Sequence, residues 1–328
     1  MSNGLYEHKT FCVAPMMAWT DRHCRYLHRL YAPSARLFTE MITTGALLHG
    51  KQLRLLDYSD HEHPIVAQLG GNDPTSLAKC AKLVADRGYD EVNLNVGCPS
   101  DRVQRGTFGA CLMAHPELVA TCVKAMQDAC DIPVTVKCRL GIDSANTEGF
   151  LDDFIDAIVA AGCARVYLHA RIAVLGGLSP AQNRSVPPLL PERVHRVKRD
   201  FPSLEVIMNG GITSLDKALD HLAWADGVMV GRAAYHNPDL LAEVDVAISG
   251  EERTVNKLAL LSDYQDYVQS QLSQGVRLHS MTRHLLSSCN GLPGARRFRQ
   301  VLSDNKRLKD NDITLLDHAL AHVFERAA

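Results

Sequence analysis

Short runs rich in apolar and β-branched residues recur along the first part of the chain, and segments with helical spacing of apolar residues separate them. The runs predict eight strands: Thr10–Ala14, Arg36–Glu40, Pro64–Leu69, Glu91–Val96, Pro133–Arg139, Arg165–Ala170, Glu205–Asn209 and Gly227–Val230. The segments between them predict helices over Asp21–Tyr31, Pro74–Arg87, Pro116–Ala129, Gly149–Ala161, Pro191–Phe201 and Ser214–Ala223. Strands and helices that alternate in this number, over about 230 residues, predict an α/β fold of the (β/α)8 TIM-barrel type.

The glycine motifs favour this closed barrel over the competing fold, an open doubly wound sheet. No G-x-G-x-x-G motif follows the first strand or occurs elsewhere in the chain, although a dinucleotide-binding sheet carries one there. Instead, Asn209-Gly210-Gly211 follows the seventh strand and Gly231-Arg232 follows the eighth. Many barrels hold a phosphate at these two loops, through backbone N–H groups and a short helix N-terminus. The sequence therefore predicts a phosphate site there.

The pattern changes near residues 240–254. Beyond this point the chain shows helical periodicity without a convincing strand, and Gly291–Gly294 breaks the helices. We expect a catalytic barrel domain over residues 1–245 and a small α-helical bundle domain over residues 246–328. Within the bundle, residues 276–309 hold eight Lys or Arg and one acidic residue, whereas the whole chain has a formal net charge of −2. A near-neutral barrel thus carries a basic helical attachment.

Composition narrows the class of protein. The chain has 328 residues, of which 46% are hydrophobic and 22% charged, so it can bury a sizeable core and is not a disordered chain. No apolar run approaches the ~18–20 residues that span a bilayer, and the short apolar stretch at Phe11–Trp19 indicates a strand and loop rather than a signal peptide. Ten scattered cysteines without a C-x-x-C pair fit a reducing compartment and argue against disulfides and structural zinc. We expect a cytoplasmic protein with no membrane association, no metal centre and no obligate protein partner.

Catalytic groups of a barrel lie at the carboxyl ends of its strands. In the fourth strand, apolar residues alternate with Asn93 and Asn95, so we expect the asparagines to face the barrel mouth and the apolar residues to face the helices. Cys98 follows directly, on a loop between Gly97 and Pro99. This position and its polar neighbours make Cys98 a candidate for chemistry, whereas burial as small hydrophobes explains the other cysteines.

Other strand ends supply further polar groups. Lys137 and His169 lie at the ends of the fifth and sixth strands, and Gln68 ends the third, where its amide could contact a cofactor ring or cap the next loop. Pro15-Met16-Met17 follows the first strand, where the methionines could belong to the core or pack under a flat aromatic ligand. Together with the phosphate site, these groups fit a phosphorylated cofactor with a flat polar ring, such as FMN. The sequence shows neither the aligned carboxylates of a glycosidase nor clustered metal ligands.

These residues in combination resemble a known family, the tRNA-dihydrouridine synthases. The resemblance rests on Ala14-Pro15-Met16, Asn93–Pro99, Val136-Lys137, His169-Ala170-Arg171, Asn209-Gly210-Gly211 and Gly231-Arg232. The strings Trp19–Tyr26, Pro99–Gln104 and Gly177–Pro180 are similar to those of the A-type bacterial subfamily. The resemblance covers nearly the whole chain. One departure is Ile172-Ala173-Val174, where that subfamily would carry a Lys and an aromatic residue.

The resemblance implies a flavin-bearing barrel followed by a helical bundle that grips tRNA. It implies that FMN is bound by Pro15, Met16, Met17, Gln68, Lys137, His169, Asn209, Gly210, Gly211, Gly231 and Arg232. It implies that Cys98 is the catalytic acid. The candidates for contact with tRNA are Asn95, Arg184, Arg296 and Arg299.

The implied activity is reduction of the C5=C6 bond of uridines 20 and 20a in the D-loop of tRNA to 5,6-dihydrouridine, with NADPH as the electron donor. Conjugation to the C4 carbonyl makes C6 the electrophilic carbon, so the reduced flavin would deliver hydride to C6 and Cys98 would protonate C5. A thiol suits this role, because its reference pKa of about 8.5 keeps it protonated near neutral pH. The base must leave its stack to reach the mouth, while the basic helices would set the register by phosphate contacts.

Two other classes of protein stay open at this stage. A non-redox barrel could use Lys137 to form a Schiff base with a phosphorylated sugar, which leaves the basic helices unexplained. A catalytically inert tRNA-binding protein would make the positions of Cys98, Lys137 and His169 coincidental. The colour of the purified protein separates the three classes, because a flavin enzyme is yellow.

Overall fold

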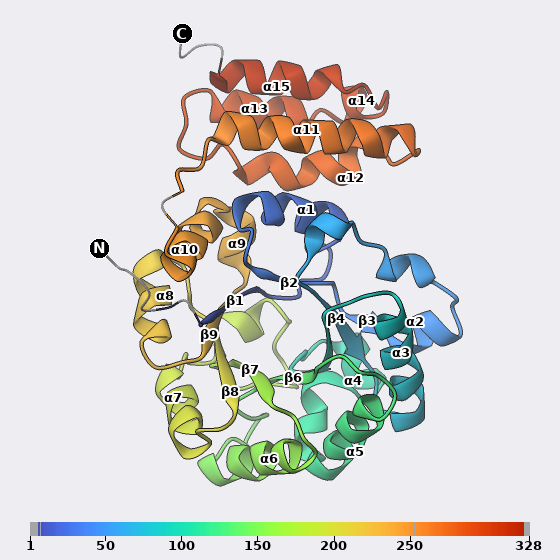
Figure 1. Cartoon of the computed structure of the whole chain (residues 1–328), viewed down its shortest axis with the longest axis vertical. Coiled ribbons are helices and arrows are strands. Elements are labelled where there is room, and N and C mark those ends of the chain that lie inside the picture. Colours follow the sequence, from blue (N-terminus) through green and yellow to red (C-terminus); the bar gives the residue numbers. More distant parts are fainter. Residues whose placement is uncertain (1–5, 7, 252, 325–328) are drawn as a thin grey trace.

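The computed structural model describes residues 6, 8–251 and 253–324, in which a closed barrel of parallel strands lies beneath a layer of helices (Figure 1). The barrel wall consists of β1 (Thr10–Val13), β2 (Arg36–Phe38), β4 (Ile65–Gly70), β5 (Glu91–Val96), β6 (Val134–Arg139), β7 (Arg165–His169), β8 (Glu205–Asn209) and β9 (Gly227–Val230). All neighbouring strands pair in parallel, and β2 pairs with both β1 and β4, which closes the cylinder. The expected (β/α)8 barrel is confirmed, and the open sheet is excluded.

The sequence pattern locates the strands of the wall to within two residues at each end. It does not predict β3 (Ile42–Thr43), which pairs with β4 at Leu69 and Gly70. A strand of two residues is too short to show alternation, and for that reason the pattern cannot reveal it.

The predicted barrel helices are all present, as α1 (Arg22–Tyr31), α3 (Pro74–Asp86), α5 (Pro116–Gln127), α6 (Glu148–Ala160), α7 (Pro191–Asp200) and α8 (Leu215–Leu222). Their first turns are encoded locally. The Asp21 carboxylate caps α1 by accepting from the N–H groups of His23 and Cys24, and the Asp73 carboxylate caps α3 by accepting from the N–H group of Ser76. The connections contain shorter elements: α2 (Thr44–Leu48), α4 (Asp101–Arg105), α9 (Arg232–His236) and the 3-10 turns η1 (Leu53–Leu56), η2 (Asp60–Glu62), η3 (Gly109–Ala114) and η4 (Gln182–Arg184).

Alternation along each strand separates the core outside the barrel from the barrel interior. As expected, Val92, Leu94 and Val96 of β5 belong to the apolar core between strands and helices. The interior contains a smaller apolar cluster that includes Phe38 and Met229. Polar side chains occupy the interior on either side of this cluster, at the two ends of the barrel.

The amino end of the barrel is filled by an ionic network around Glu91. Its fully buried carboxylate accepts hydrogen bonds from four side chains, those of Arg36, Thr135, Arg165 and Tyr167, at 2.6 to 3.0 Å. Four donors satisfy a carboxylate that would be costly to bury alone. Access to the barrel interior is therefore confined to the carboxyl end, the mouth.

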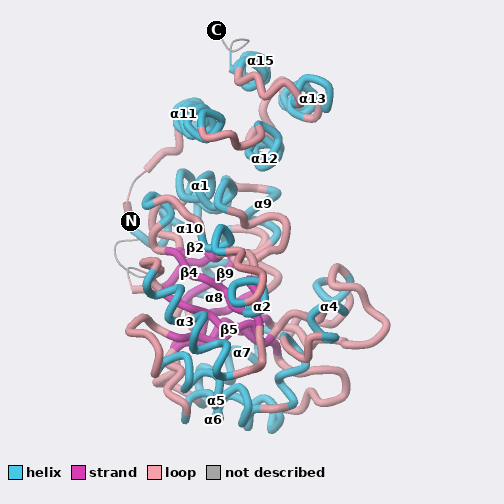
Figure 2. Tube along the Cα trace, turned by 90° about the vertical axis from the view of Figure 1, so that its right-hand side faces the viewer, coloured by secondary structure: helices cyan, strands magenta, loops and turns pink. Residues whose placement is uncertain are grey.

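The C-terminal helices form a layer of their own. After α10 (Asp239–Ser249), which packs on the barrel, the chain continues through α11 (Lys257–Ser273), α12 (Leu278–Thr282), the 3-10 turn η5 (Arg283–Ser287), α13 (Ala295–Leu302), α14 (Asn305–Leu308) and α15 (Thr314–Phe324). Helices α11 and α12 contact α1, whereas α13 and α15 pack together farther from the barrel (Figure 2). In the described residues 254–324 no strand occurs, and Gly291–Gly294 separates η5 from α13, both as expected.

The expected division between residues 245 and 246 falls inside α10, and the layer of helices begins only at Lys257. Residues 1–5, 7, 252 and 325–328, which belong to the two expected domain ranges, lie outside the described residues.

One buried apolar cluster joins the barrel to the helical layer. Leu27 and Tyr31 of α1 and Tyr264 of α11 all belong to it. The Tyr264 hydroxyl lies 3.2 Å from the carbonyl oxygens of both His23 and Met281. The two parts of the chain therefore share hydrophobic surface. Among the described residues, no helix combines the length and the apolar character needed to cross a membrane.

Candidate active site at the barrel mouth

Three amide side chains form a buried network on β4 and β5. Gln68 Nε2 donates to Asn93 Oδ1 at 2.8 Å, and Asn95 Nδ2 donates to Gln68 Oε1 at 2.8 Å. Asn93 Nδ2 in turn donates to Thr135 Oγ1, which donates to the Glu91 carboxylate. The interior position expected for both asparagines is confirmed, and the network connects the mouth to the ionic network at the amino end.

The loop that carries Cys98 is fixed from two neighbouring strands. Asn95 Oδ1 accepts from the N–H groups of Gly97 and Cys98, at 3.2 and 3.0 Å. Arg139 Nε donates to the Gly97 carbonyl at 3.0 Å. The half-buried thiol itself makes one hydrogen bond, to Ser100 Oγ at 3.4 Å. Arg139 was not among the site residues predicted from the sequence, although it lies two residues after Lys137 and therefore points to the same side of β6.

Lys137 and His169 face a strongly cationic interior. Lys137 Nζ donates to Asn209 Oδ1 at 2.9 Å. Burial, with a smaller contribution from the Arg139 guanidinium, lowers the pKa of Lys137 to about 8. Burial and the positive charges of Arg139 and Lys137 hold the pKa of His169 well below its usual range, so its imidazole is neutral at physiological pH. A ligand here meets an amine that titrates near neutrality and an uncharged imidazole.

Gly210 and Gly211 follow β8 in a conformation that other residues rarely adopt, with φ of +109° and +73°. A Cβ atom at Gly210 would lie 2.7 Å from His169 Cδ2, and one at Gly211 would lie 2.3 Å from Leu189 Cδ2. Both the φ angles and the lack of space therefore require glycine. Their backbone can approach a ligand that a side chain would keep away.

Arg171, which follows β7, Arg184 of η4 and Arg232, at the start of α9, lie close to one another. Arg232 Nη2 donates to the Arg184 carbonyl oxygen at 3.2 Å. Burial, together with the charge of Arg232, lowers the pKa of both Arg171 and Arg184. Among the described residues, none of these three arginines forms an ion pair with a carboxylate; the arginines that do so are others. This uncompensated positive charge is suited to a bound anion with two negative charges.

A cavity of about 550 Å³ opens beside Cys98. Met17 and Glu40 line it from the barrel, and Ser280 of α12 lines it from the helical layer. Met17 is 60% exposed. The cavity thus connects the thiol to the C-terminal helices, and it could admit a base from a large ligand held by both parts of the chain.

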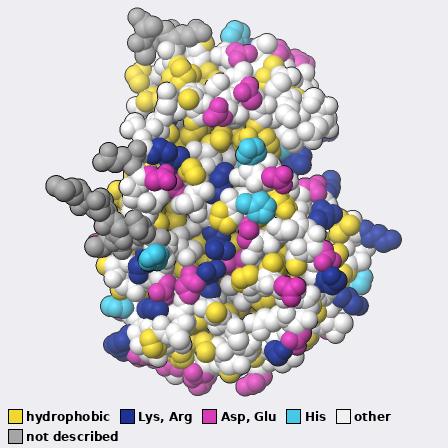
Figure 3. All heavy atoms as spheres, in the orientation of Figure 1, with side chains coloured by type: hydrophobic (Ala, Val, Ile, Leu, Met, Phe, Trp, Pro, Cys, Tyr) yellow, Lys and Arg dark blue, Asp and Glu magenta, His cyan; other side chains and the backbone are white. Residues whose placement is uncertain are grey.

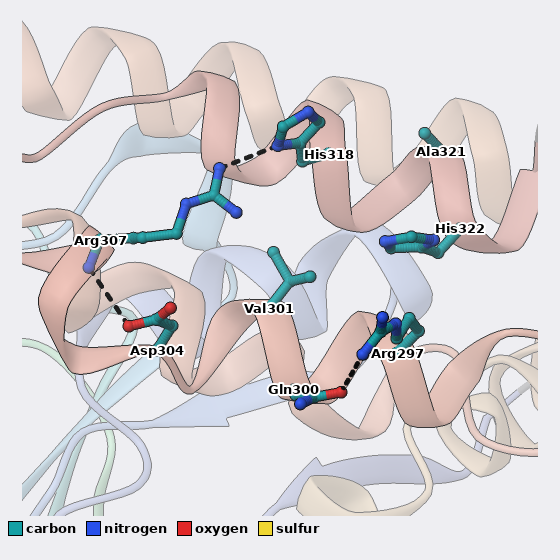
Figure 4. A pocket seen from close by; sticks show the side chains of 8 residues that line it. All are labelled: Arg297, Gln300, Val301, Asp304, Arg307, His318, Ala321 and His322. Atoms are coloured by element: carbon teal, nitrogen blue, oxygen red, sulfur yellow. Dashed lines mark hydrogen bonds between the residues drawn. The ribbon is translucent and has the colours of Figure 1, made fainter.

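Of the arginines expected to contact tRNA, two lie on α13 and are exposed. Arg296 makes no hydrogen bond to another described residue, whereas Arg299 Nη1 donates to Asn290 Oδ1 at 2.7 Å. Arg297, on another side of the same helix, donates to Gln300 and lines a groove of about 590 Å³ between α13, α14 and α15 (Figure 4). That groove also presents Arg307. On the face seen in Figure 3, acidic and basic side chains are interspersed over the barrel.

Comparison with known proteins identifies the family. The family model for dihydrouridine synthase (Dus) matches residues 12–324. This chain belongs to the dihydrouridine synthase family. A tRNA-dihydrouridine(20/20a) synthase from Shewanella oneidensis is 55% identical over 298 residues, which are 90% of this chain and 89% of that protein. Proteins of the same name from Escherichia coli K12 and Pseudomonas syringae are 54% and 53% identical, over 96% and 95% of this chain and 92% and 93% of their own lengths.

The mouth of this dihydrouridine synthase fits FMN on three grounds. The glycine turn and the arginine trio suit a phosphate dianion, and Lys137, His169 and the amides supply polar groups for a ring edge. The segment Pro15–Met17 directly follows β1, and Ala14 before it lies against Gly231 at the end of β9. Among the described residues, no group of three or more His, Cys, Asp or Glu could hold a metal ion.

Proposed function

We propose that this chain reduces the C5=C6 bond of uridines 20 and 20a in the D-loop of tRNA to 5,6-dihydrouridine, with bound FMN and with NADPH as the electron donor. Membership of the family supports dihydrouridine synthase activity. The relatives named tRNA-dihydrouridine(20/20a) synthase are similar to this chain over about nine tenths of their own length, 89% and 92% in two of them. The observation that carries the proposal is that Cys98 lies at a cavity reached from both parts of the chain, at a mouth that also offers a seat for a phosphate.

The flavin would be held around the mouth. Asn209, Gly210, Gly211, Gly231 and Arg232 would bind its phosphate, and Pro15, Met16, Met17, Gln68, Lys137 and His169 would contact its ring system. When bound, FMN would supply hydride chemistry for reduction of the C5=C6 bond of the uracil, with NADPH as the source of electrons. The family resemblance and the chemistry of these donors support the assignment.

Cys98 would act as the general acid that protonates C5. The loop bonds from Asn95 and Arg139 hold the thiol at the cavity, so the proton donor is positioned before the substrate arrives. The guanidinium groups of Arg139 and Arg184 lie near Cys98, and they would stabilise negative charge that develops on O4 of the uracil.

The tRNA would contact both parts of the chain. We propose Asn95 and Arg184 as contacts near the reacting base, and Arg296 and Arg299 as contacts with the phosphate backbone. The barrel, up to the end of α10 at Ser249, would supply catalysis, and the helices from Lys257 onward would supply tRNA binding, so that the junction lies in the segment between α10 and α11. Such an enzyme would work in the cytoplasm, where its substrates occur.

The decisive experiment is purification of the protein followed by a flavin spectrum and an assay on unmodified tRNA. A yellow protein that forms dihydrouridine at positions 20 and 20a with NADPH supports the proposal, and sequencing of D-loops from a strain lacking the protein identifies the natural sites. The lowered pKa of Lys137 would also suit a Schiff base. A colourless protein that borohydride links to a sugar phosphate through Lys137 would overturn the flavin proposal.

A further inference from the structure

The segment after β1 takes a sharp turn at Ala18, whose φ is +62°. Trp19 and Thr20 donate their N–H groups to the Met16 carbonyl, and the Thr20 hydroxyl accepts from the Met16 N–H at 2.9 Å. A residue with a side chain holds a left-handed conformation only where its surroundings enforce it. The surroundings of Ala18 therefore decide the shape of the segment.

Both peptide groups of Ala18 are held by charged side chains from distant parts of the chain. The Glu40 carboxylate, in the connection between β2 and β3, accepts from the Ala18 N–H. The Arg283 guanidinium, from η5 in the helical layer, donates to the Ala18 carbonyl. Hydrogen bonds to charged groups are stronger than those between neutral groups. Arg283 is 265 positions away from Ala18 in the sequence. A residue of the helical layer therefore holds the carbonyl group of this turn.

The next residues in the sequence, Trp19 after Ala18 and His284 after Arg283, make further contacts between the turn and the helical layer. Trp19 stacks on Tyr235 with ring centroids 4.6 Å apart and an angle of 15° between the planes. The Tyr235 hydroxyl lies 3.1 Å from His284 Nδ1, and His284 Nε2 lies 3.0 Å from an Asp21 carboxylate oxygen. The turn is thus tied to η5 through Arg283 and through the chain of contacts from Trp19 to His284.

We propose that Arg283 is a positioning residue for the flavin: by fixing the Ala18 carbonyl, it sets the place of Met16 and Met17 against the flavin ring. The inference rests on the proposed function, because it takes FMN to lie against Pro15–Met17. It goes beyond that function by giving the C-terminal helices a part in shaping the cofactor site in addition to holding tRNA. Met17 and Glu40 line the same cavity as Cys98, so a shift of this turn also changes the space available to the base.

The experiment compares Arg283→Ala with Arg297→Ala, in which an exposed arginine of the same helical layer loses only a bond to Gln300. The chain has two tryptophans. Trp224 is removed by Trp224→Phe in all variants, so that emission reports Trp19 alone. Acrylamide quenching of Trp19 is measured without flavin, followed by the FMN dissociation constant and the visible absorption and circular dichroism of bound FMN.

For Arg283→Ala we expect stronger quenching of Trp19, an FMN dissociation constant raised roughly 5- to 20-fold and altered visible circular dichroism of the flavin, with thermal unfolding close to that of Arg297→Ala. Arg283→Lys keeps the charge but not the planar fork, and should restore part of the affinity. Unchanged FMN affinity and spectra in Arg283→Ala would overturn the positioning role and leave the proposed function standing. A wild-type protein that binds no FMN would instead overturn the proposed function and this role with it.

Discussion

At the scale of single residues, the position of Cys98 depends more on its neighbours than on its own contacts. Asn95 and Arg139 bind the backbone of its loop, whereas the thiol makes a single weak hydrogen bond to Ser100. Removal of the sulfur should therefore leave the loop, and the proposed flavin site across the mouth, unchanged.

We expect Cys98→Ala to retain FMN and to oxidise NADPH, but to form dihydrouridine about 10²–10⁴-fold more slowly, because a positioned general acid is lost. Single-turnover reduction of unmodified tRNA measures this rate. Cys111→Ala is the control, since Cys111 is also half-buried but its thiol donates to the Phe108 carbonyl. Near-normal turnover in Cys98→Ala would remove Cys98 from the mechanism.

Lys137 gives a prediction about pH and stability. Its pKa is about 8 in the folded chain, lowered first by burial from an ordinary value of 10.5. Between these values the unfolded chain binds more protons than the folded chain, so Lys137 makes the free energy of unfolding rise with pH. We expect flavin-free wild type to gain stability relative to Lys137→Met between pH 7 and pH 10, as measured by urea unfolding at each pH. A constant difference between the two proteins would contradict the lowered pKa.

Residues at strand ends are the part of the site that sequence can reveal. Cys98, Lys137 and His169 were identifiable because strand pattern, alternation and barrel geometry together place such residues at the mouth. The roles of Glu40 and Arg283 were not identifiable. Each bonds a backbone group of Ala18 from a distant segment, and no local pattern encodes a contact between a side chain and a remote backbone.

At the scale of elements, the turn after β8 and the start of α9 form the proposed phosphate seat. We expect Arg232→Ala to lower FMN occupancy without abolishing it, because a charge-assisted bond is lost while Arg171, Arg184 and the backbone of Gly210 and Gly211 stay in place. Flavin content after dialysis measures the effect, and a loss of affinity of roughly tenfold is expected. Full retention of flavin would count against this site.

Helix α13 gives a prediction about tRNA. If the face with Arg296 and Arg299 meets the phosphate backbone, changing both to Glu should weaken tRNA binding and leave flavin content unchanged. The slope of log affinity against log salt concentration should become shallower, by up to roughly 0.7–0.9 for each lost phosphate contact. Titration of labelled tRNA at several salt concentrations measures both quantities.

Arg297→Glu is the control for this helix, because Arg297 lies at the groove on another side of α13. Asn290→Ala is also needed, since Arg299 donates to Asn290 and its replacement could act through that loop. An unchanged affinity and slope in the double variant would remove α13 from the tRNA interface.

The sequence pattern predicts the long helices and strands but misses the shortest elements. Every long strand and helix of the barrel was predictable, because each repeats its period several times. Very short elements such as β3, with two residues, and η2, with three, contain no more than one period. They form because of tertiary contacts, as in the buried ion pair between Glu62 of η2 and Arg25 of α1.

At the scale of the whole molecule, the core that the barrel and the helical layer share predicts that the two parts unfold together. We expect Tyr264→Ala to destabilise both parts together, by about 3–5 kcal/mol, because it removes a fully buried ring at their junction. Tyr264→Phe keeps the ring and should cost about 1 kcal/mol. Calorimetry should show one transition that shifts as a whole. Two separate transitions, with only one of them shifted, would show that the parts unfold independently.

The ionic network around Glu91 has a consequence for the order of events. Because this network fills the amino end of the barrel, both reactants of the proposed reaction would enter through the mouth. If a nicotinamide and a flipped uracil, both flat rings, use the same side of the flavin in the proposed reaction, one must depart before the other enters. We then expect steady-state kinetics of the ping-pong form, with parallel double-reciprocal lines. In the proposed reaction the electron donor would bind at the place that the RNA later occupies, and it would not require a dinucleotide-binding domain for this.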